Sequence, residues 1–82
     1  MPTILKDRGF RYFFYSDEGS PLEPCHVHVH VSNGDGEAKF WVGENVSVAY
    51  NHGLNRRDLA LAMMVVRAKR SQFERAWHGY FG

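Results

Sequence analysis

The segment CHVHVH, Cys25–His30, alternates histidine with valine and has the clearest capacity for chemistry in this sequence. Successive side chains of a strand point to opposite faces, so His26, His28 and His30 would share one face of a sheet. Imidazole nitrogens bind metal ions and also exchange protons near neutral pH. The segment therefore suggests a metal site or an acid–base centre, beside the simpler interpretation of a polar sheet face.

A metal site would need two of these histidines and one ligand from elsewhere in the chain. Positions i and i+2 lie about 6.7 Å apart along a strand, whereas His26 and His30 would be about 13 Å apart, too far to share one ion easily. Zinc binds imidazole nitrogens at about 2.0–2.1 Å. We predict a divalent metal such as zinc held by His26, His28 and His78, with His52 and Glu37 as other sources of the third ligand.

The second chemical hypothesis is acid–base catalysis. Histidine can act as a general acid and base near neutral pH, and a lysine can stabilise the charge that develops on a phosphate. The residues assigned to this activity are His26, His28 and Lys39, in a histidine-centred ribonuclease or a metal-dependent hydrolase. The sequence offers no accompanying nucleophile, so an enzyme is the alternative rather than the leading hypothesis.

A β-hairpin is predicted to position these side chains. Apolar residues alternate over 27–31 and again over 37–42, and Ser32-Asn33-Gly34-Asp35-Gly36 between them is typical of a turn. We expect a register that places the apolar side chains of both strands on one side, facing the core. In this register Val31 pairs with Ala38, Val29 with Phe40 and Val27 with Val42. It also sets His30 opposite Lys39 and His28 opposite Trp41.

Further strands are predicted around this hairpin. The segments are Thr3–Lys6, Phe10–Tyr15 and a short strand at Val46–Ala49, with a glycine-, proline- and acid-rich loop over 16–24. Five of the six residues in Phe10–Tyr15 are aromatic, which favours a strand. We expect Phe10, Tyr12 and Phe14 to line the core, and Phe13 and Tyr15 to flank the histidine face.

Two helices are predicted in the second half of the chain. Asn55 resembles an N-cap, and apolar residues recur at helical spacing from there to about Lys69. A second helix is expected to begin near Ser71. The sequence therefore predicts a single α+β domain over residues 1–82, with an antiparallel sheet of about four strands in the N-terminal half packed by two C-terminal helices.

Charge is divided unevenly along the chain. Residues 1–50 carry four basic and seven acidic side chains, whereas residues 51–82 carry six basic and two acidic, for a net charge of +1. Arg56, Arg67 and Arg70 would fall within about 60° on a helical wheel, forming a stripe that can follow a phosphate backbone. The residues predicted to contact nucleic acid or a protein partner are Arg56, Arg67, Arg70 and Trp41. A solvated helix face is the simpler interpretation.

Composition favours a small cytoplasmic protein. Hydrophobic residues make up 44% of the 82 residues, enough to form a core without disulfide bonds or a structural metal ion. Cys25 is the single cysteine, so the chain forms no internal disulfide, which suits a reducing compartment. The longest apolar run, Leu59–Val66, is too short to cross a bilayer, and we expect no membrane contact.

Five segments spread over the chain carry a family resemblance: MPTIL, RYFFYS, PCHVHV, GEAKFWV and AWHGYFG. They resemble a small prokaryotic family of domains of unknown function whose members typically read MPTI…FYS…PPHVHV…AKFW…AWHEYF. The polar positions that the resemblance singles out are His26, His28, Lys39, Trp41 and His78. This chain departs from the pattern at Cys25, where proline is usual, at Gly79, where glutamate is usual, and in the extra His30.

The resemblance implies no established activity. It implies that the protein is encoded beside a second small domain of unknown function and that the two form a toxin–antitoxin-like pair. The leading hypothesis is therefore a non-enzymatic interaction module that binds a protein partner encoded nearby, with nucleic acid as a further partner. A homodimer is also expected if Phe10–Tyr15 forms an apolar edge strand that needs cover.

Overall fold

A five-stranded antiparallel sheet and two α-helices make up the computed structural model, which describes residues 3–19, 21–32 and 34–82. The elements are β1 (Thr3–Asp7), β2 (Phe10–Phe13), the 3₁₀ turn η1 (Ser16–Glu18), β3 (His26–Val31), β4 (Glu37–Val42), β5 (Val46–His52), α1 (Arg56–Ala68) and α2 (Arg70–Phe81). The predicted α+β class is confirmed, and β5 extends beyond the predicted Val46–Ala49. Residues outside the description are Met1 and Pro2 of the MPTIL motif, Ser20 of the predicted loop and Asn33 of the predicted turn.

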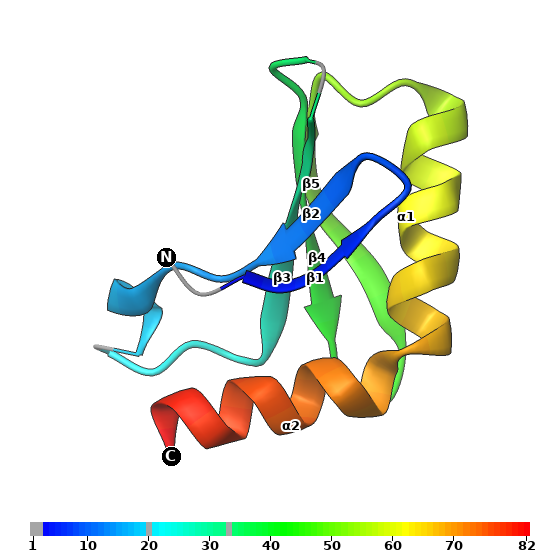
Figure 1. The fold of residues 1–82 in the computed structure, drawn as a ribbon. Coiled ribbons are helices and arrows are strands. Elements are labelled where there is room, and N and C mark those ends of the chain that lie inside the picture. Colours follow the sequence, from blue (N-terminus) through cyan, green and yellow to red (C-terminus); the bar gives the residue numbers. More distant parts are fainter. Residues whose placement is uncertain (1–2, 20, 33) are drawn as a thin grey trace.

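The helices cover the valine face of the sheet. Figure 1 shows α1 standing along the sheet, while α2 runs across the ends of the strands towards the segment that joins β2 to β3. The core between them contains Val27, Val29, Ala38, Phe40, Ala62, Val66 and Phe73. The period-2 pattern of the sequence therefore predicted the apolar core face correctly, although the histidine face is buried as well. None of the described helices is long and apolar enough to span a membrane.

The β3–β4 hairpin is tighter than the predicted one. Its observed pairs are Val29–Ala38, Val27–Phe40, His28–Lys39 and His26–Trp41, a slide of two residues from the predicted register. The N–H of Val31 donates to the carbonyl of Gly36 at 3.2 Å, so the connection spans 32–35, one residue shorter than the predicted turn Ser32–Gly36. A slide of two residues keeps every side chain on its predicted face and changes only its partner across the strands.

The aromatic strand lies inside the sheet. Each strand pairs with its neighbour in sequence, so β2 lies between β1 and β3 and the edges are β1 and β5. The predicted reason for a homodimer, an exposed apolar edge at Phe10–Tyr15, is therefore wrong. Phe10 and Tyr12 do line the core, as predicted. Phe14 has left the strand and packs on Trp77 of α2, with ring centroids 5.5 Å apart.

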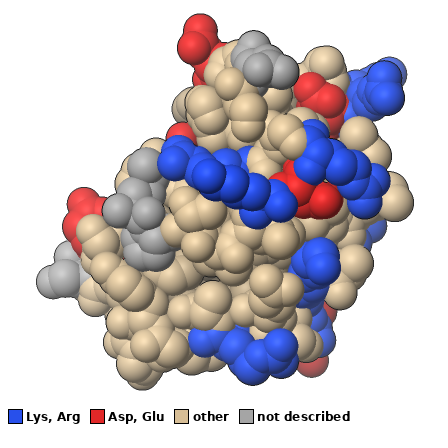
Figure 2. Space-filling model, viewed as in Figure 1, with Lys and Arg blue, Asp and Glu red and all other residues tan. Residues whose placement is uncertain are grey.

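The predicted arginine stripe is interrupted. Helix α1 ends at Ala68, and Lys69 adopts non-helical angles, so Arg70 begins α2. The Arg70 guanidinium donates to the carbonyls of Gly43 at 2.9 Å and Glu44 at 2.7 Å, which ties it to the β4–β5 turn. Arg56 and Arg67 are exposed. Figure 2 shows the basic side chains on one face separated by uncharged and acidic residues rather than merged into one patch.

Gly36 and Gly53 approach each other closely at the end of the tight hairpin. A Cβ at the buried Gly36 would lie 3.0 Å from the backbone of Gly53, which itself has a φ of +99°. Gly36→Ala is therefore expected to lower the free energy of unfolding by about 1–3 kcal/mol through overpacking. Gly34→Ala is the matched control, because nothing lies within 4 Å of its Cβ, and its effect should stay within about 0.5 kcal/mol. Equal losses in urea unfolding of the two variants would contradict this assignment.

Candidate functional site

Glu18, His26 and His28 meet on the face of β3 that points away from the valine core. Oε2 of Glu18 lies 2.6 Å from Nε2 of His26 and 2.8 Å from Nε2 of His28. One ligating atom from each residue can be chosen so that all three lie within 4.8 Å of one another. His26 is 1% exposed and His28 is 3% exposed. The structure thus brings two of the predicted histidines together and adds a carboxylate from the loop before them.

A short turn holds the Glu18 carboxylate in place. Oε1 of Glu18 accepts the N–H of Tyr15 at 2.7 Å, and the N–H of Glu18 donates to the Tyr15 carbonyl at 3.2 Å. These reciprocal bonds close the turn η1 directly after the aromatic strand. The next residue, Gly19, packs so closely on the ring of Phe81 that a Cβ would clash with it. The loop is thereby fixed both to its own backbone and to the end of α2.

The hydrogen bonds of His26 determine which ring nitrogen carries a proton. Nδ1 of His26 lies 2.9 Å from the carbonyl oxygen of Pro24. A carbonyl oxygen only accepts, so Nδ1 must be the donor. A neutral His26 then has its lone pair on Nε2, which faces Glu18.

The same reasoning applies to His28 through a tyrosine. The hydroxyl of Tyr50 donates to Oε2 of Glu37 at 2.9 Å. Its single hydrogen is thereby used, so its oxygen accepts from Nδ1 of His28 at 3.2 Å. Burial and the hydrogen bond to Glu37 raise the pKa of Tyr50, so the hydroxyl keeps its proton. A neutral His28 would therefore also direct the lone pair of Nε2 towards Glu18.

Three electron-rich atoms converge as a result. Burial raises the pKa of Glu18, but hydrogen bonds with His28, the Tyr15 N–H and His26 outweigh burial and hold it below the ordinary value. Hydrogen bonds from the two imidazoles to the carboxylate require a proton on each Nε2 in addition to the one on Nδ1, whereas neutral rings would turn two lone pairs towards the ionised carboxylate oxygen. Such an arrangement needs a positive charge at its centre, supplied either by extra protons on the imidazoles or by a metal ion.

Aromatic rings enclose the group. Phe13 stacks on His28 with centroids 5.5 Å apart, and Tyr15 meets the same ring at 4.7 Å, which confirms that both residues flank the histidine face. Trp77 of α2 lies 4.6 Å from the His26 ring. Because these rings keep water away, charge interactions inside the group are stronger than they would be at the surface.

Lys39 and Trp41 interact mainly with each other and with the loop. Nζ of Lys39 lies 3.3 Å from Oε1 of Glu23 and 4.3 Å above the ring of Trp41. The lysine amine is thus engaged by a carboxylate and an aromatic face, although its backbone pairs with His28. Trp41 in turn contacts His26, with centroids 5.6 Å apart.

The predicted metal ligands His78 and His52 lie outside the group around Glu18. His78 is exposed on α2 and borders a separate groove with Cys25 and Trp41, so it is not part of the group around Glu18. Burial raises the pKa of Cys25 to about 11, with a smaller contribution from Glu74, so its thiol stays protonated. His52 is exposed, with its ring beside Tyr50.

Sequence reasoning missed Glu18 and Tyr50. Glu18 belongs to a loop in which acidic residues show no periodicity, and Tyr50 lies beyond the predicted end of the last strand. The available signal was the concentration of three acids, Asp17, Glu18 and Glu23, shortly before two strand histidines. Glu37 was considered as a metal ligand, but in the structure it orients Tyr50.

Comparison with known proteins places the chain in a family. Residues 9–78 match the family model described as "Domain of unknown function (DUF4160)". No curated protein and no solved structure matches the chain.

The role of Tyr50 can be tested by removing its hydroxyl. Tyr50→Phe leaves the ring in place but takes away the acceptor for Nδ1 of His28, and Glu37, at 3.6 Å, is too distant to replace it. We expect the free energy of unfolding to fall by about 1–3 kcal/mol. Tyr80→Phe, on a side chain that is 51% exposed, should change it by no more than about 0.5 kcal/mol. Chemical denaturation that gives the same value for both variants would exclude the proposed hydrogen-bond chain.

Proposed function

Because the chain belongs to the DUF4160 family, whose function is unknown, we propose a function from its own buried site: a small metal-stabilised module that binds a protein partner. The observation that carries the proposal is the convergence of two Nε2 atoms on one carboxylate oxygen of Glu18, in a buried position. A divalent cation such as zinc is bound there by Glu18, His26 and His28. The metal joins the loop before β3 to the sheet.

The ligand chemistry supports a metal more than two extra protons. Zinc takes imidazole nitrogens and carboxylate oxygens at about 2.0–2.2 Å. Two donors on a tetrahedral ion are then about 3.3 Å apart, so the present distances of 2.6 and 2.8 Å would open by roughly half an ångström. Metal-bound histidines usually donate the other ring N–H to a carbonyl or a similar acceptor. His26 and His28 both do so, to Pro24 and to Tyr50.

Burial of the site favours binding over catalysis. His26 and His28 have almost no exposed surface, and the amine of Lys39 is engaged by Glu23 and Trp41. A phosphate or peptide substrate would have to displace the surrounding aromatic rings to reach Nε2. The module acts instead through its surface, in a toxin–antitoxin-like pair whose second member is encoded nearby.

The loop fixed by Glu18 provides a surface for that partner. Gly19 pairs with Leu22 across a short bridge, and Leu22 is 61% exposed. Gly19 also packs on Phe81, so Leu22 extends from a segment anchored at both the histidine site and α2. An exposed leucine on an anchored loop is a suitable contact for an apolar surface of a protein partner.

A metal-dependent hydrolase is the second candidate function. Two histidines and one carboxylate leave a coordination position for water, as in catalytic zinc sites. For that function the loop around Glu18 would have to open. RNA cleavage by the zinc-loaded protein that disappears in Glu18→Gln would favour the hydrolase over the binding module.

Metal binding is tested on protein purified without a histidine tag. Elemental analysis should find about one equivalent of zinc per chain, and chelation should lower the melting temperature, since a ligand at 100 times its Kd stabilises a fold by about 2.7 kcal/mol. Glu18→Gln, which keeps the side-chain shape, should lose both the zinc and the response to chelator.

His78→Ala is the matched control for this experiment. His78 is a histidine on the exposed side of α2, so its removal should leave zinc content and chelator response unchanged. A wild-type protein without metal and without a zinc-dependent melting temperature would reject the metal centre. Loss of zinc in His78→Ala would reject the assigned ligand set.

Partner binding is tested by co-expression with the product of the adjacent gene, followed by size-exclusion chromatography. We expect one co-eluting complex, weakened at least tenfold in affinity by Leu22→Ser, because a buried apolar contact is lost. Met64→Ser is the control, since Met64 is equally exposed, at 64%, but lies on α1. Two independent monomer peaks for the wild-type pair would count decisively against the interaction module.

A further inference from the structure

The edge strand β5 has no charged or proline residue that would prevent another strand from pairing with it. Its seven residues, Val46–His52, include no lysine, arginine, aspartate, glutamate or proline. Apart from its ladder with β4, the backbone of β5 makes no hydrogen bond to any described residue. The unpaired N–H and C=O groups of an edge strand can pair with the strand of another chain, and proteins usually block such an edge with charges or proline.

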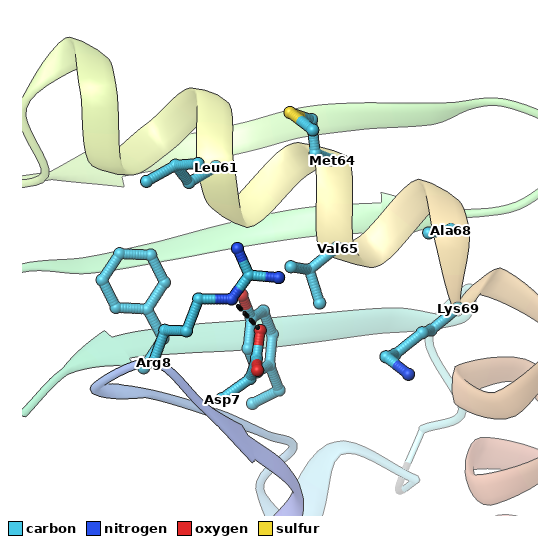
Figure 3. Close-up of a pocket in the computed structure, with 9 residues that line it drawn as sticks. Asp7, Arg8, Leu61, Met64, Val65, Ala68 and Lys69 are labelled. Carbon is cyan, nitrogen blue, oxygen red and sulfur yellow. Dashed lines mark ion pairs between the residues drawn. The ribbon is translucent and has the colours of Figure 1, made fainter.

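The other edge strand, β1, is protected by charge. Two of its five residues, Lys6 and Asp7, are charged. Figure 3 shows Asp7 paired with Arg8 at the end of this strand, and Nε of Arg8 lies 3.3 Å from Oδ2 of Asp7. Each edge strand has one extra residue in its ladder, Ile4 in β1 and Ala49 in β5, so bulges do not distinguish the two edges. Charge does distinguish them, and β5 is the edge that stays open.

Val48 shows that the core is incompletely covered at this edge. It pairs with Phe40, which has no exposed surface, and therefore lies on the core side of the sheet. Val48 is nevertheless 39% exposed, whereas Val46 on the same side of the same strand is 7% exposed. A further strand beside β5 would bury this apolar surface and provide partners for the outer backbone groups.

The charges at the two ends of β5 are opposite. Glu44 lies two residues before the strand, and Arg56 and Arg57 lie four and five residues after it. All three side chains are exposed, and none takes part in an ion pair between described residues. When two copies of β5 pair antiparallel about a two-fold axis, the start of each strand lies beside the end of the other. Glu44 of each copy then approaches the arginines of the other, whereas parallel pairing would bring like charges together.

We propose that β5 pairs antiparallel with β5 of a second copy of this chain, so that the two five-stranded sheets become one continuous sheet. The complementary charges at the strand ends favour a second copy, and a strand without charges places no like charges opposite each other. This edge differs from the predicted dimer edge at Phe10–Tyr15, because β2 lies inside the sheet. It contains neither the metal ligands nor Leu22, so the dimer does not depend on the proposed function.

The test is sedimentation velocity of the full chain, purified without any other protein, over a series of concentrations. We expect a reversible equilibrium between a monomer and a species of twice its mass. Val48→Lys places a charge at the open edge, with a side chain long enough to reach solvent, and should remain monomeric. Met64→Lys is the matched control, since Met64 is an exposed apolar residue on α1, and it should dimerise like the wild type.

Charge reversals test the two-fold arrangement. Glu44→Arg and the double variant Arg56→Glu/Arg57→Glu should each weaken dimerisation by about fivefold or more, since like charges then meet at both ends of the strand pair. An equimolar mixture of these two proteins should dimerise as well as the wild type, because each end again combines opposite charges. Acidic residues are favourable in the first turn of a helix, so the double variant should stay folded. Arg75→Glu, at an exposed position of α2, should have no effect.

Three results would overturn the proposal. The first is a wild-type chain that stays monomeric at every concentration. The second is a folded Val48→Lys variant that dimerises with the wild-type affinity. The third is a mixture of the two charge-reversal proteins that dimerises no better than either protein alone. Circular dichroism and the melting temperature show whether Val48→Lys is folded, and the mixture decides the matter if it is not.

Discussion

One carboxylate oxygen shared by two buried imidazoles is the interaction on which the arrangement of this protein depends. His26 and His28 follow each other at i and i+2, so one strand face presents two polar rings where a valine would be easier to bury. The chain supplies Glu18 from a preceding turn, at 2.6 and 2.8 Å from the two rings. That contact allows the loop and Trp77 to cover the histidines, and it thereby determines the path of the chain between β2 and β3.

Both faces of β3 are consequently buried, by different means. On one face, Val27 and Val29 pack against the helices through apolar contacts alone. On the other, hydrogen bonds to Pro24 and Tyr50 satisfy the outer ring nitrogens, and aromatic rings fill the space between. This 82-residue chain thus buries side chains on both faces of a single strand. Apolar packing buries one face, and a hydrogen-bonded polar network buries the other.

The parts of the fold that follow a local period could be predicted from the sequence. Alternation identified the valine face, and Asn55 marked the start of α1, where its side chain accepts from the N–H of Asp58. The register could not be predicted, because a slide of two residues preserves alternation, and the close approach of Gly36 to Gly53 in the observed register joins residues that no local pattern relates. Glu18 was missed for a similar reason: a carboxylate in a loop gains its role only when the loop folds back.

The strand order β1-β2-β3-β4-β5 also bears on how the protein folds. Every strand pairs with its immediate neighbour in sequence, and only the connection between β2 and β3, residues 14–25, is long, so most contacts of the sheet are local and favour rapid folding. Helix α2 is the exception, since Trp77 and Phe81 return to contact Phe14, more than sixty positions earlier in the chain. Sheet formation can therefore begin while the chain is still being synthesised, but enclosure of the histidines must wait for the last helix.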